Sequence, residues 1–462
     1  MRKVCDFMIR FDLPFLKKIQ LTPVQLIVLS YFMATLLSMF LLSLPFSIRD
    51  GVEVSIIDLL FTAVSAISVT GLTVVNTAET FTPFGVVMLM IILQLGGIGL
   101  MTLGTFIYIL LGRNIGLAHR QLIMIDQNRH SLKGLVHTIK LVFGFALAIE
   151  AIGGFIFGAY FLYTDFAPTW YHAFYYGFFH SLSSYTNGGF DIFGNSLMPF
   201  SHDYFVQTVT MILIILGALG FPVLIEIKSK LSGKYPDFRF SLFAKLTTFT
   251  FFILLIVGAI SIFLLERNLF MAGMPWHEKL FHSFFFSVTS RNGGLATLDV
   301  NLFSIPTLFL ISTLMFIGAS PSSVGGGIRT TTFAVVILTI LTFSKGKREV
   351  RVFKRRLAEE DIMKSFVVFS TAIMLVITSI IIIESIEQNK SSLISIIFEV
   401  CSAFGTTGLS MGITPELSNI SKTILIILMF IGRIGVLSFL WFMSNTNQKS
   451  KVSYPEEKVI IG

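Results

Sequence analysis

Four short glycine motifs recur along the chain, and their residue types suit the handling of a small cation. They read Ser68-Val69-Thr70-Gly71-Leu72, Tyr185-Thr186-Asn187-Gly188-Gly189-Phe190, Arg291-Asn292-Gly293-Gly294-Leu295 and Gly405-Thr406-Thr407-Gly408-Leu409. Glycine tolerates φ > 0 and lets backbones approach closely. Carbonyl oxygens on an unwound strand at membrane depth need partners, which an alkali cation supplies by exchanging its water shell for them. The motifs therefore predict a selectivity filter.

The motifs align on the glycine that Leu or Phe follows, which is Gly71, Gly189, Gly294 and Gly408. Register alone rejects Gly188 and Gly293. Two further columns support this register: Ser65, Ser183, Val288 and Ser402 lie six residues upstream, and Gly96, Gly217, Gly318 and Gly432 lie 24 to 28 residues downstream. The alternative is that each glycine is an ordinary helix C-cap, but four copies in register favour four strands around one axis. The predicted filter residues are Val69, Thr70, Gly71, Asn187, Gly188, Gly189, Asn292, Gly293, Gly294, Thr406, Thr407 and Gly408.

The composition requires a membrane to surround these motifs. Of the 462 residues, 54% are hydrophobic and 13% are charged, and the mean hydropathy is +0.82. This composition excludes a soluble enzyme. It also excludes a nucleic-acid binder, because the net charge of +8 is spread over loops between apolar runs and is not gathered on one basic face. Runs of about 20 or more apolar residues are long enough to cross a bilayer. They predict eight spans, at 21–46, 83–111, 135–163, 204–227, 241–265, 303–343, 363–384 and 420–443.

A shorter apolar stretch precedes each glycine motif, at 56–68, 170–184, 276–288 and 392–404. Such segments are too short to span and predict re-entrant helices, whose C-terminal ends aim partial negative charge at the axis. The fold class is therefore all-α integral membrane: four pseudo-repeated membrane-pore-membrane units around a single pore. The predicted divisions are the N-terminus 1–20, repeat 1 (21–115), repeat 2 (116–230), repeat 3 (231–360), repeat 4 (361–445) and the tail 446–462.

Lysine and arginine set the orientation, because cytoplasmic loops carry an excess of both. Of the 34, the two termini and the loops between repeats hold 26, and the opposite side holds six. Both termini are therefore predicted to be cytoplasmic, in a multi-pass protein of the cell membrane. The tail segment Tyr454–Lys458 is a candidate subunit contact.

The run 303–343 would measure about 62 Å as one helix, roughly twice the bilayer thickness. Proline and consecutive glycines must break it. The break reads Gly318, Ala319, Ser320, Pro321, Ser322, Ser323, Val324, Gly325, Gly326 and Gly327. Because it interrupts a span in one repeat only, beneath the filter, we predict a gate; a static kink is the alternative.

Three charged residues, Arg433, Arg291 and Glu150, are expected at membrane depth and need partners. Arg433, near the middle of the last span, costs at least about 2.5 kcal/mol on insertion scales and should bind carbonyls or hydroxyls of the gate segment, such as Ser322 and Ser323. Arg291 should point behind the filter, with Glu399 as a candidate partner. Glu150 is expected to form structural hydrogen bonds.

The segment from Lys345 to Lys364 carries eight basic residues, with Val350, Phe353 and Leu357 at helical spacing. It predicts either a docking face or an anchor on anionic lipid. Cys5 and Cys401 do not indicate a disulfide framework. The sequence contains no Walker loop, dinucleotide fingerprint or metal-ligand cluster, so nucleotide control needs another polypeptide.

Over nearly its whole length the chain resembles the Trk/Ktr/HKT superfamily of potassium channel-like transporters and, within it, the Ktr-type (KtrB-like) membrane subunit. The four units, the four filter glycines, the interrupted sixth span and Arg433 carry this resemblance. It implies K+ as the transported ion, Na+ as an activator in some relatives, and no nucleotide bound by this chain. It also implies a homodimer with two pores in the lipid bilayer, gated by a cytoplasmic RCK-type nucleotide-binding ring (KtrA-like). Glycine at position 71 is linked in the superfamily to K+ selectivity.

Two other functions stay open at this level. A coupled K+/Na+ or K+/H+ symporter could use the same filter in a fixed ratio. An integral-membrane enzyme with His180 or Glu150 as an acid/base group is the remote alternative, and the sequence gives it no paired nucleophile or metal motif.

Overall fold

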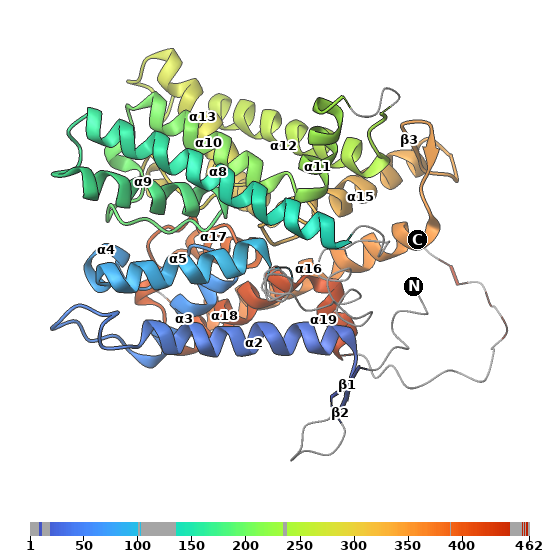
Figure 1. Cartoon of the computed structure of the whole chain (residues 1–462). Helices are drawn as coiled ribbons and strands as arrows, with labels where there is room; N and C mark the ends of the chain where they lie inside the picture. The colour runs from blue at the N-terminus through green and yellow to red at the C-terminus, as the bar shows by residue number, and fades with distance from the viewer. Residues whose placement is uncertain are drawn as a thin grey trace.

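The computed structural model describes residues 9–11, 19–99, 102, 135–233, 238–388, 390–443, 455, 457 and 459–460. These residues are almost entirely helical (Figure 1). Two small antiparallel hairpins are added, one of β1 (Ile9–Phe11) with β2 (Ile19–Leu21) and one of β3 (Arg351–Val352) with β4 (Arg355–Arg356). The segments 103–134 and 444–454 lie outside the described residues, as do the ends of the predicted run 83–111 and most of the predicted tail contact.

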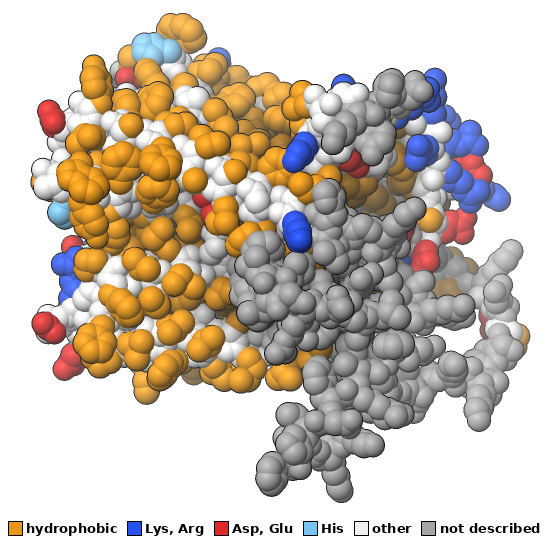
Figure 2. Space-filling model, in the orientation of Figure 1, with side chains coloured by type: hydrophobic (Ala, Val, Ile, Leu, Met, Phe, Trp, Pro, Cys, Tyr) orange, Lys and Arg blue, Asp and Glu red, His pale blue; other side chains and the backbone are white. Residues whose placement is uncertain are grey.

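Each repeat begins with a long apolar helix. These helices are α2 (Pro23–Leu42), α8 (Leu135–Tyr163), α12 (Leu242–Glu266) and α16 (Glu359–Ile386). Within the described residues, four helices are long and apolar enough to cross a membrane, and six are if each of two bent pairs counts as one span. Apolar side chains cover much of the described part of the face that Figure 2 shows, as expected where lipid tails replace water.

A short helix follows each long one, as the sequence predicted: α3 (Ile56–Ile67), α9 (Trp170–Tyr185), α13 (Trp276–Thr289) and α17 (Leu393–Gly405). Three begin at hydroxyl N-caps, where Ser55, Thr169 and Ser392 accept a backbone N–H of the first turn. Such caps satisfy donors that the start of a helix leaves unpaired. The C-terminal half of each short helix is buried, and its last residues run directly into a glycine motif.

The second outer element is broken rather than straight in repeats 2, 3 and 4, and in repeat 1 the structure describes its first helix. It comprises α5 (Pro83–Ile98), α10 (Tyr204–Ala218) with α11 (Phe221–Leu231), α14 (Ile305–Phe316) with α15 (Thr330–Ser344), and α18 (Asn419–Ile434) with α19 (Val436–Met443). The pairs α10–α11 and α18–α19 bend by 102°. The prediction that a break occurs in repeat 3 only is therefore wrong.

Single glycines explain these bends. Gly99, Gly220 and Gly435 follow their column glycines by three residues and share φ of 90° to 95° with ψ of 130° to 139°, a conformation that only glycine adopts readily. The same position in repeat 3 is Pro321, whose ring fixes φ near −65°. Repeat 3 consequently cannot make the one-residue bend, and residues 317–329 form a loop between α14 and α15 instead.

Contacts between repeats close the bundle into a ring. Each short helix packs against the long helix of its own repeat and against the second helix of the preceding one, in the pairs α5 with α9, α10 with α13, α14 with α17 and α18 with α3. The last pair joins repeat 4 back to repeat 1. There, Lys422 Nζ lies 2.8 Å from Asp58 Oδ1 across 364 residues of sequence.

The remaining short elements are α4 (Thr77–Thr80) and three 3₁₀ turns, at Met198–Phe200, Val300–Leu302 and Thr414–Glu416. The basic segment from Lys345 to Lys364 differs from its prediction. Val350 and Leu357 do not share a helical stripe, because the residues between them form the β3–β4 hairpin, in which Leu357 N donates to Val350 O at 3.0 Å. Phe353 and Lys354 occupy its turn with positive φ.

The downstream glycine column sets how closely the helices pack. A methyl group added at Gly432 would overlap the Phe404 carbonyl at the end of α17, and additions at Gly96 and Gly217 would overlap the carbonyls of Ile67 and Tyr185. In repeat 3, Gly318 instead meets Gly326 of its own loop.

Gly432→Ala should therefore lower the free energy of unfolding by about 1–3 kcal/mol, the usual cost of overpacking. The matched control is Gly144→Ala in α8, where nothing lies within 4 Å of an added methyl group and helix propensity favours alanine. Unfolding midpoints of the purified variants in detergent check this. Equal midpoints for Gly432→Ala and the parent would contradict the close contact.

Candidate ion pathway

The four registered glycines meet one another in a closed ring. A methyl group added at Gly71 would lie 2.8 Å from Gly189 Cα, one at Gly189 3.1 Å from Gly294 Cα, one at Gly294 3.2 Å from Gly408 Cα, and one at Gly408 3.0 Å from Gly71 Cα. All four have φ between 65° and 94°. Residues separated by up to 337 positions thus lie together, and any side chain here would enter the space between the strands.

The residue two positions before each ring glycine also has positive φ. These residues are Val69, Asn187, Asn292 and Thr406, with φ of 56°, 55°, 79° and 51°. Non-glycine residues rarely adopt this conformation, and a β-branched one is a clear outlier. Its fourfold recurrence means that the surrounding structure imposes it, and such strain is typical of functional sites.

Backbone carbonyl oxygens approach this ring. The Gly188 oxygen lies 2.6 Å from the methyl position of Gly71, and the oxygens of Thr70 and Thr407 abut the methyl positions of Gly408 and Gly294. The adjoining N–H groups of Thr70, Gly188 and Thr407 bond back to the short helices at 2.7 to 2.9 Å, on the oxygens of Ser65, Ser183 and Ser402. The donors of the strands are thereby occupied within the protein.

Hydroxyl groups support the strands from behind. Ser65 and Ser402 accept the N–H of Gly71 and Gly408, both at 3.1 Å, and Ser183 donates to Phe190 O at 2.6 Å. In repeat 3 the residue in this role is Thr289, which accepts Leu295 N and donates to Leu295 O, rather than Val288. In repeat 3 the hydroxyl that supports the strand therefore comes from the residue after Val288, because valine has no hydroxyl.

Gly188 and Gly293 lie outside the ring. Their φ values are not positive, and methyl groups there would meet the side chains of Leu93 and Thr186 at Gly188, and Ile214 and Thr289 at Gly293. The four short helices end at the ring, so their C-terminal partial charges favour a cation there.

Arg291 points away from the ring. Its side chain is fully buried, donates through Nη2 to Gly318 O at 2.8 Å and lies over the Phe251 ring at 5.5 Å. The predicted partner Glu399 is wrong. Glu399 accepts Ser410 Oγ at 2.6 Å, Met411 N at 2.8 Å and Thr414 Oγ1 at 2.9 Å, because it closes the loop that follows the fourth strand.

The loop 317–329 is buried and is bonded to two other repeats. Ser320 N donates to Ala218 O at 3.2 Å, and Phe221 N donates to Ser322 O at 3.0 Å, which ties the loop to the α10–α11 bend. Gly326 N donates to Thr406 Oγ1 at 2.7 Å, so the same loop is bonded directly to the fourth strand. It therefore lies against the ring and not at a distance from it.

Arg433 joins this loop to repeat 1. Its guanidinium donates to Val324 O in the loop and to Gly96 O at the end of α5. A loop carbonyl is thus its partner, while the Ser323 hydroxyl instead donates to Ser320 O at 2.6 Å.

The sequence reasoning missed Arg329, which donates to Gly325 O. Its position directly after the triple glycine was an available signal.

The other buried polar groups have local roles. Glu150 Oε2 accepts Gln94 Nε2 at 2.9 Å, and His180 Nε2 lies 2.8 Å from Thr210 Oγ1. Across the described part of the chain, no group of three or more His, Cys, Asp or Glu residues could hold a metal ion. The groups that the four motifs bring to the ring are main-chain oxygens, such as those of Thr70, Gly188 and Thr407.

Comparison with known proteins gives the same answer from a separate direction. Residues 31–454 match the family described as TrkH, cation transport protein. The chain belongs to the TrkH family. It is therefore a multi-pass membrane transport protein and not an enzyme, which sets aside His180 and Glu150 as catalytic groups.

The family includes relatives that align over almost the whole chain. The Ktr system potassium uptake protein D of Bacillus subtilis (strain 168) is 53% identical, over 97% of this chain and 100% of the relative. Protein B of the same system and organism is 35% identical, over 97% and 98%. The potassium/sodium uptake protein NtpJ of Enterococcus hirae is 33% identical, over 96% and 98%. These matches confirm the resemblance to the Ktr type.

The fold agrees with a solved member of the TrkH family. The potassium transporter TrkH from Vibrio parahaemolyticus superposes with a TM-score of 0.71 at 18% identity, covering 92% of this chain and 85% of that one. The protein is thus an all-helical membrane protein with a TrkH-like fold.

Replacing any one ring glycine by Ser should change the discrimination between K+ and Na+, because a Cβ would displace the neighbouring strand. A shift of about 1.4 kcal/mol per site would appear as a tenfold change in ion preference. Apparent K+ affinity and Na+ competition, measured for Gly71→Ser, Gly189→Ser, Gly294→Ser and Gly408→Ser at matched folded levels, check this.

Gly188→Ala is the matched control, since its backbone is not strained and it meets mainly the flexible tip of Leu93. A larger loss of discrimination in this control than in Gly189→Ser would contradict the ring.

Proposed function

We propose that this protein is the membrane subunit of a Ktr-type potassium uptake system and that K+ crosses the membrane through the ring of Gly71, Gly189, Gly294 and Gly408. The observation that carries the proposal is the closure of four strands from four repeats into one ring. The named activities of the relatives, potassium uptake in two and potassium/sodium uptake in a third, support it.

Selection of K+ would follow from the geometry of the strands. The ion would exchange water for main-chain oxygens such as those of Thr70, Gly188 and Thr407, which lie at the ring. Because the strand N–H groups are bonded to the short helices, the oxygens can face the axis without rearrangement. The helix ends add negative potential where the cation loses its hydration shell.

The loop 317–329 would act as the gate, with the predicted segment from Gly318 to Gly327 at its centre. It is bonded to Thr406 of the fourth strand on one side and to the α10–α11 bend on the other. It is attached by main-chain hydrogen bonds and by the side chains of Arg291, Thr406 and Arg433, and breaking these few bonds would let it leave as a unit. Arg433 would also repel cations in the closed state, since a charge at low dielectric acts over several ångströms.

The wider architecture follows the same reasoning. Eight spans in four membrane-pore-membrane repeats, at 21–115, 116–230, 231–360 and 361–445, would surround one pore, with both termini in the cytoplasm. Two copies would form a homodimer, and an RCK-type nucleotide-binding ring would bind from the cytoplasm. Na+ would act as an activator of K+ uptake, whereas the name of the relative NtpJ speaks of potassium/sodium uptake.

Tracer Rb+ uptake into liposomes that hold the purified chain tests the function, with and without Na+. We expect uptake that K+ competes with, that follows the membrane potential and that exceeds any fixed ratio to Na+ or H+. A constant ion ratio under all gradients would identify a coupled symporter instead. Absence of uptake in both the parent and an Arg433→Ala variant would contradict ion translocation by this chain.

Arg433→Ala should raise basal Rb+ flux several-fold in the absence of a regulatory partner, because it removes the contacts to Val324 O and Gly96 O and also removes the charge. Arg433→Lys keeps the charge but cannot bridge two carbonyls as a guanidinium does, so it should raise flux less. Flux equal to that of the parent in a well-folded Arg433→Ala protein would show that the arginine does not hold the gate.

A further inference from the structure

A cavity opens at the end of α15 where the helix leaves the apolar bundle. Its volume is about 570 Å³, within the range of small-ligand sites of roughly 300–1,000 Å³. Leu338 and Leu341 of α15 line it together with Lys345, Lys347, Arg348 and Arg351, which follow them in the sequence. The apolar lining residues thus lie on the last turns of α15, and the basic ones lie on the segment that follows the helix.

The apolar residues of the neighbouring hairpin are already used within the chain. Val350 is only 1% exposed, and Val352 and Leu357 pack with Leu246 of α12 and Ala334 of α15. The Phe353 ring lies 6.0 Å from that of Phe249. The apolar residues that were predicted to contact a partner protein therefore hold the hairpin against α12 and α15. The surface that remains is mainly charged.

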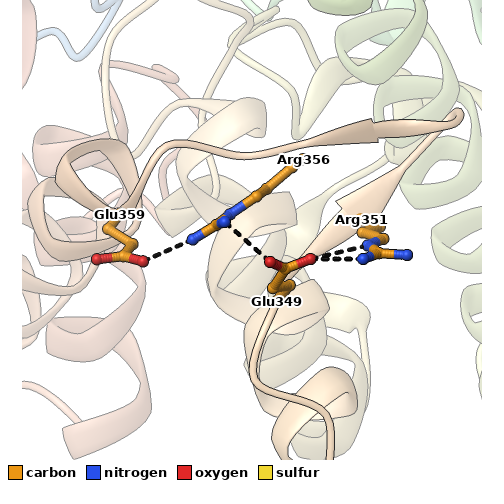
Figure 3. Close-up of polar contacts among 4 residues, drawn as sticks. All are labelled: Glu349, Arg351, Arg356 and Glu359. Carbon is orange, nitrogen blue, oxygen red and sulfur yellow. Dashed lines mark hydrogen bonds and ion pairs between the residues drawn. The ribbon is translucent and has the colours of Figure 1, made fainter.

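The acidic residue in the cavity wall is already neutralised. Glu349 accepts Arg351 Nη2 at 2.6 Å and Arg356 Nη1 at 2.8 Å, and Arg356 also pairs with Glu359 at 2.8 Å (Figure 3). The hydrogen bond from Arg351, together with the charges of both arginines, holds the pKa of Glu349 below its ordinary value. Lys345, Lys347 and Arg348 have no such partner among the described residues, so the cavity keeps three uncompensated cations.

We propose that this cavity binds an anionic phospholipid, with the phosphate beside Lys345, Lys347 and Arg348 and the acyl chains along Leu338 and Leu341. The exposed Ile337, Ile340 and Phe343 extend the apolar surface along α15, so a chain entering the cavity continues into the lipid layer. Basic residues next to a spanning helix attract anionic headgroups. The inference needs only the membrane position of α15 and does not depend on ion selection at the ring.

A soluble phosphate shares the headgroup's chemistry but lacks the acyl chains. Lipid should therefore bind much more tightly than inorganic phosphate, because only lipid buries apolar surface at Leu338 and Leu341.

Native mass spectrometry of the purified full chain in neutral detergent tests this directly. The parent should retain phosphatidylglycerol in preference to phosphatidylcholine. Each cation near such a headgroup contributes about fivefold in affinity, so Lys347→Gln/Arg348→Gln should bind phosphatidylglycerol about 25-fold more weakly.

Lys354→Gln/Arg355→Gln is the matched control. It removes two positive charges from the same hairpin, at exposed positions outside the cavity, and should bind phosphatidylglycerol as the parent does. Midpoints of thermal unfolding measured without added lipid verify that both double variants fold.

Three outcomes would overturn the proposal. Equal losses in the two double variants would indicate a diffuse surface potential without a site. Inorganic phosphate raising the unfolding midpoint at the same concentration as phosphatidylglycerol would indicate a free-anion site. Unchanged lipid binding by Lys347→Gln/Arg348→Gln would show that the lipid does not bind at these cations, and a protein partner would then be the remaining occupant of the cavity.

Discussion

Peptide groups that leave helical geometry inside a bilayer must find partners within the protein, since no water is available to them. This chain leaves helical geometry in that region many times, in four strands, in glycine bends and in one long loop. The N–H groups of Thr70, Gly188 and Thr407 return to the helix ends that precede them. The hydroxyls of Ser65, Thr289 and Ser402 accept the N–H groups of Gly71, Leu295 and Gly408. Because these N–H groups are bonded within the protein, main-chain oxygens are left without such partners at the ring of four glycines. Oxygens attract cations and repel anions, so they determine the sign of the ion that the ring favours.

The same requirement explains why repeat 3 departs from the others. Pro321 occupies the position where a glycine bends the second helices of repeats 2 and 4, so a whole loop must be accommodated and its peptide groups must be satisfied. They are satisfied by Ala218, Thr406 and Arg433, which belong to the two neighbouring repeats. Arg291 is part of this solution, because its side chain takes the Gly318 carbonyl that the interrupted helix leaves free.

Much of this arrangement could be predicted from the sequence, because the constraint acts on residue types at fixed spacing. Apolar length gave the short helices to within two residues, and the Leu or Phe after each ring glycine gave the register. The bends at Gly220 and Gly435 were hidden because the hydrophobic run continues without interruption through them, and hydropathy does not report φ. Partners such as Gly318 for Arg291 were also hidden, since a backbone carbonyl has no signature in sequence. The β3–β4 hairpin was not foreseen because Val350, Phe353 and Leu357 stand at helical spacing, and spacing does not show that the chain reverses at Phe353 and Lys354.

Lys422 and Asp58 close the ring between its last and first quarters, and the whole ring therefore belongs to one polypeptide. In an assembly of four identical subunits, every amino-acid change would be present four times around the axis. Here it is present once. Arg433 adds a single positive charge where fourfold symmetry would have added four, and one quarter can carry a proline that would have disrupted all four. The quarters can therefore differ in what they contribute, so that one of them carries a buried loop while its neighbours supply the groups that hold this loop in place.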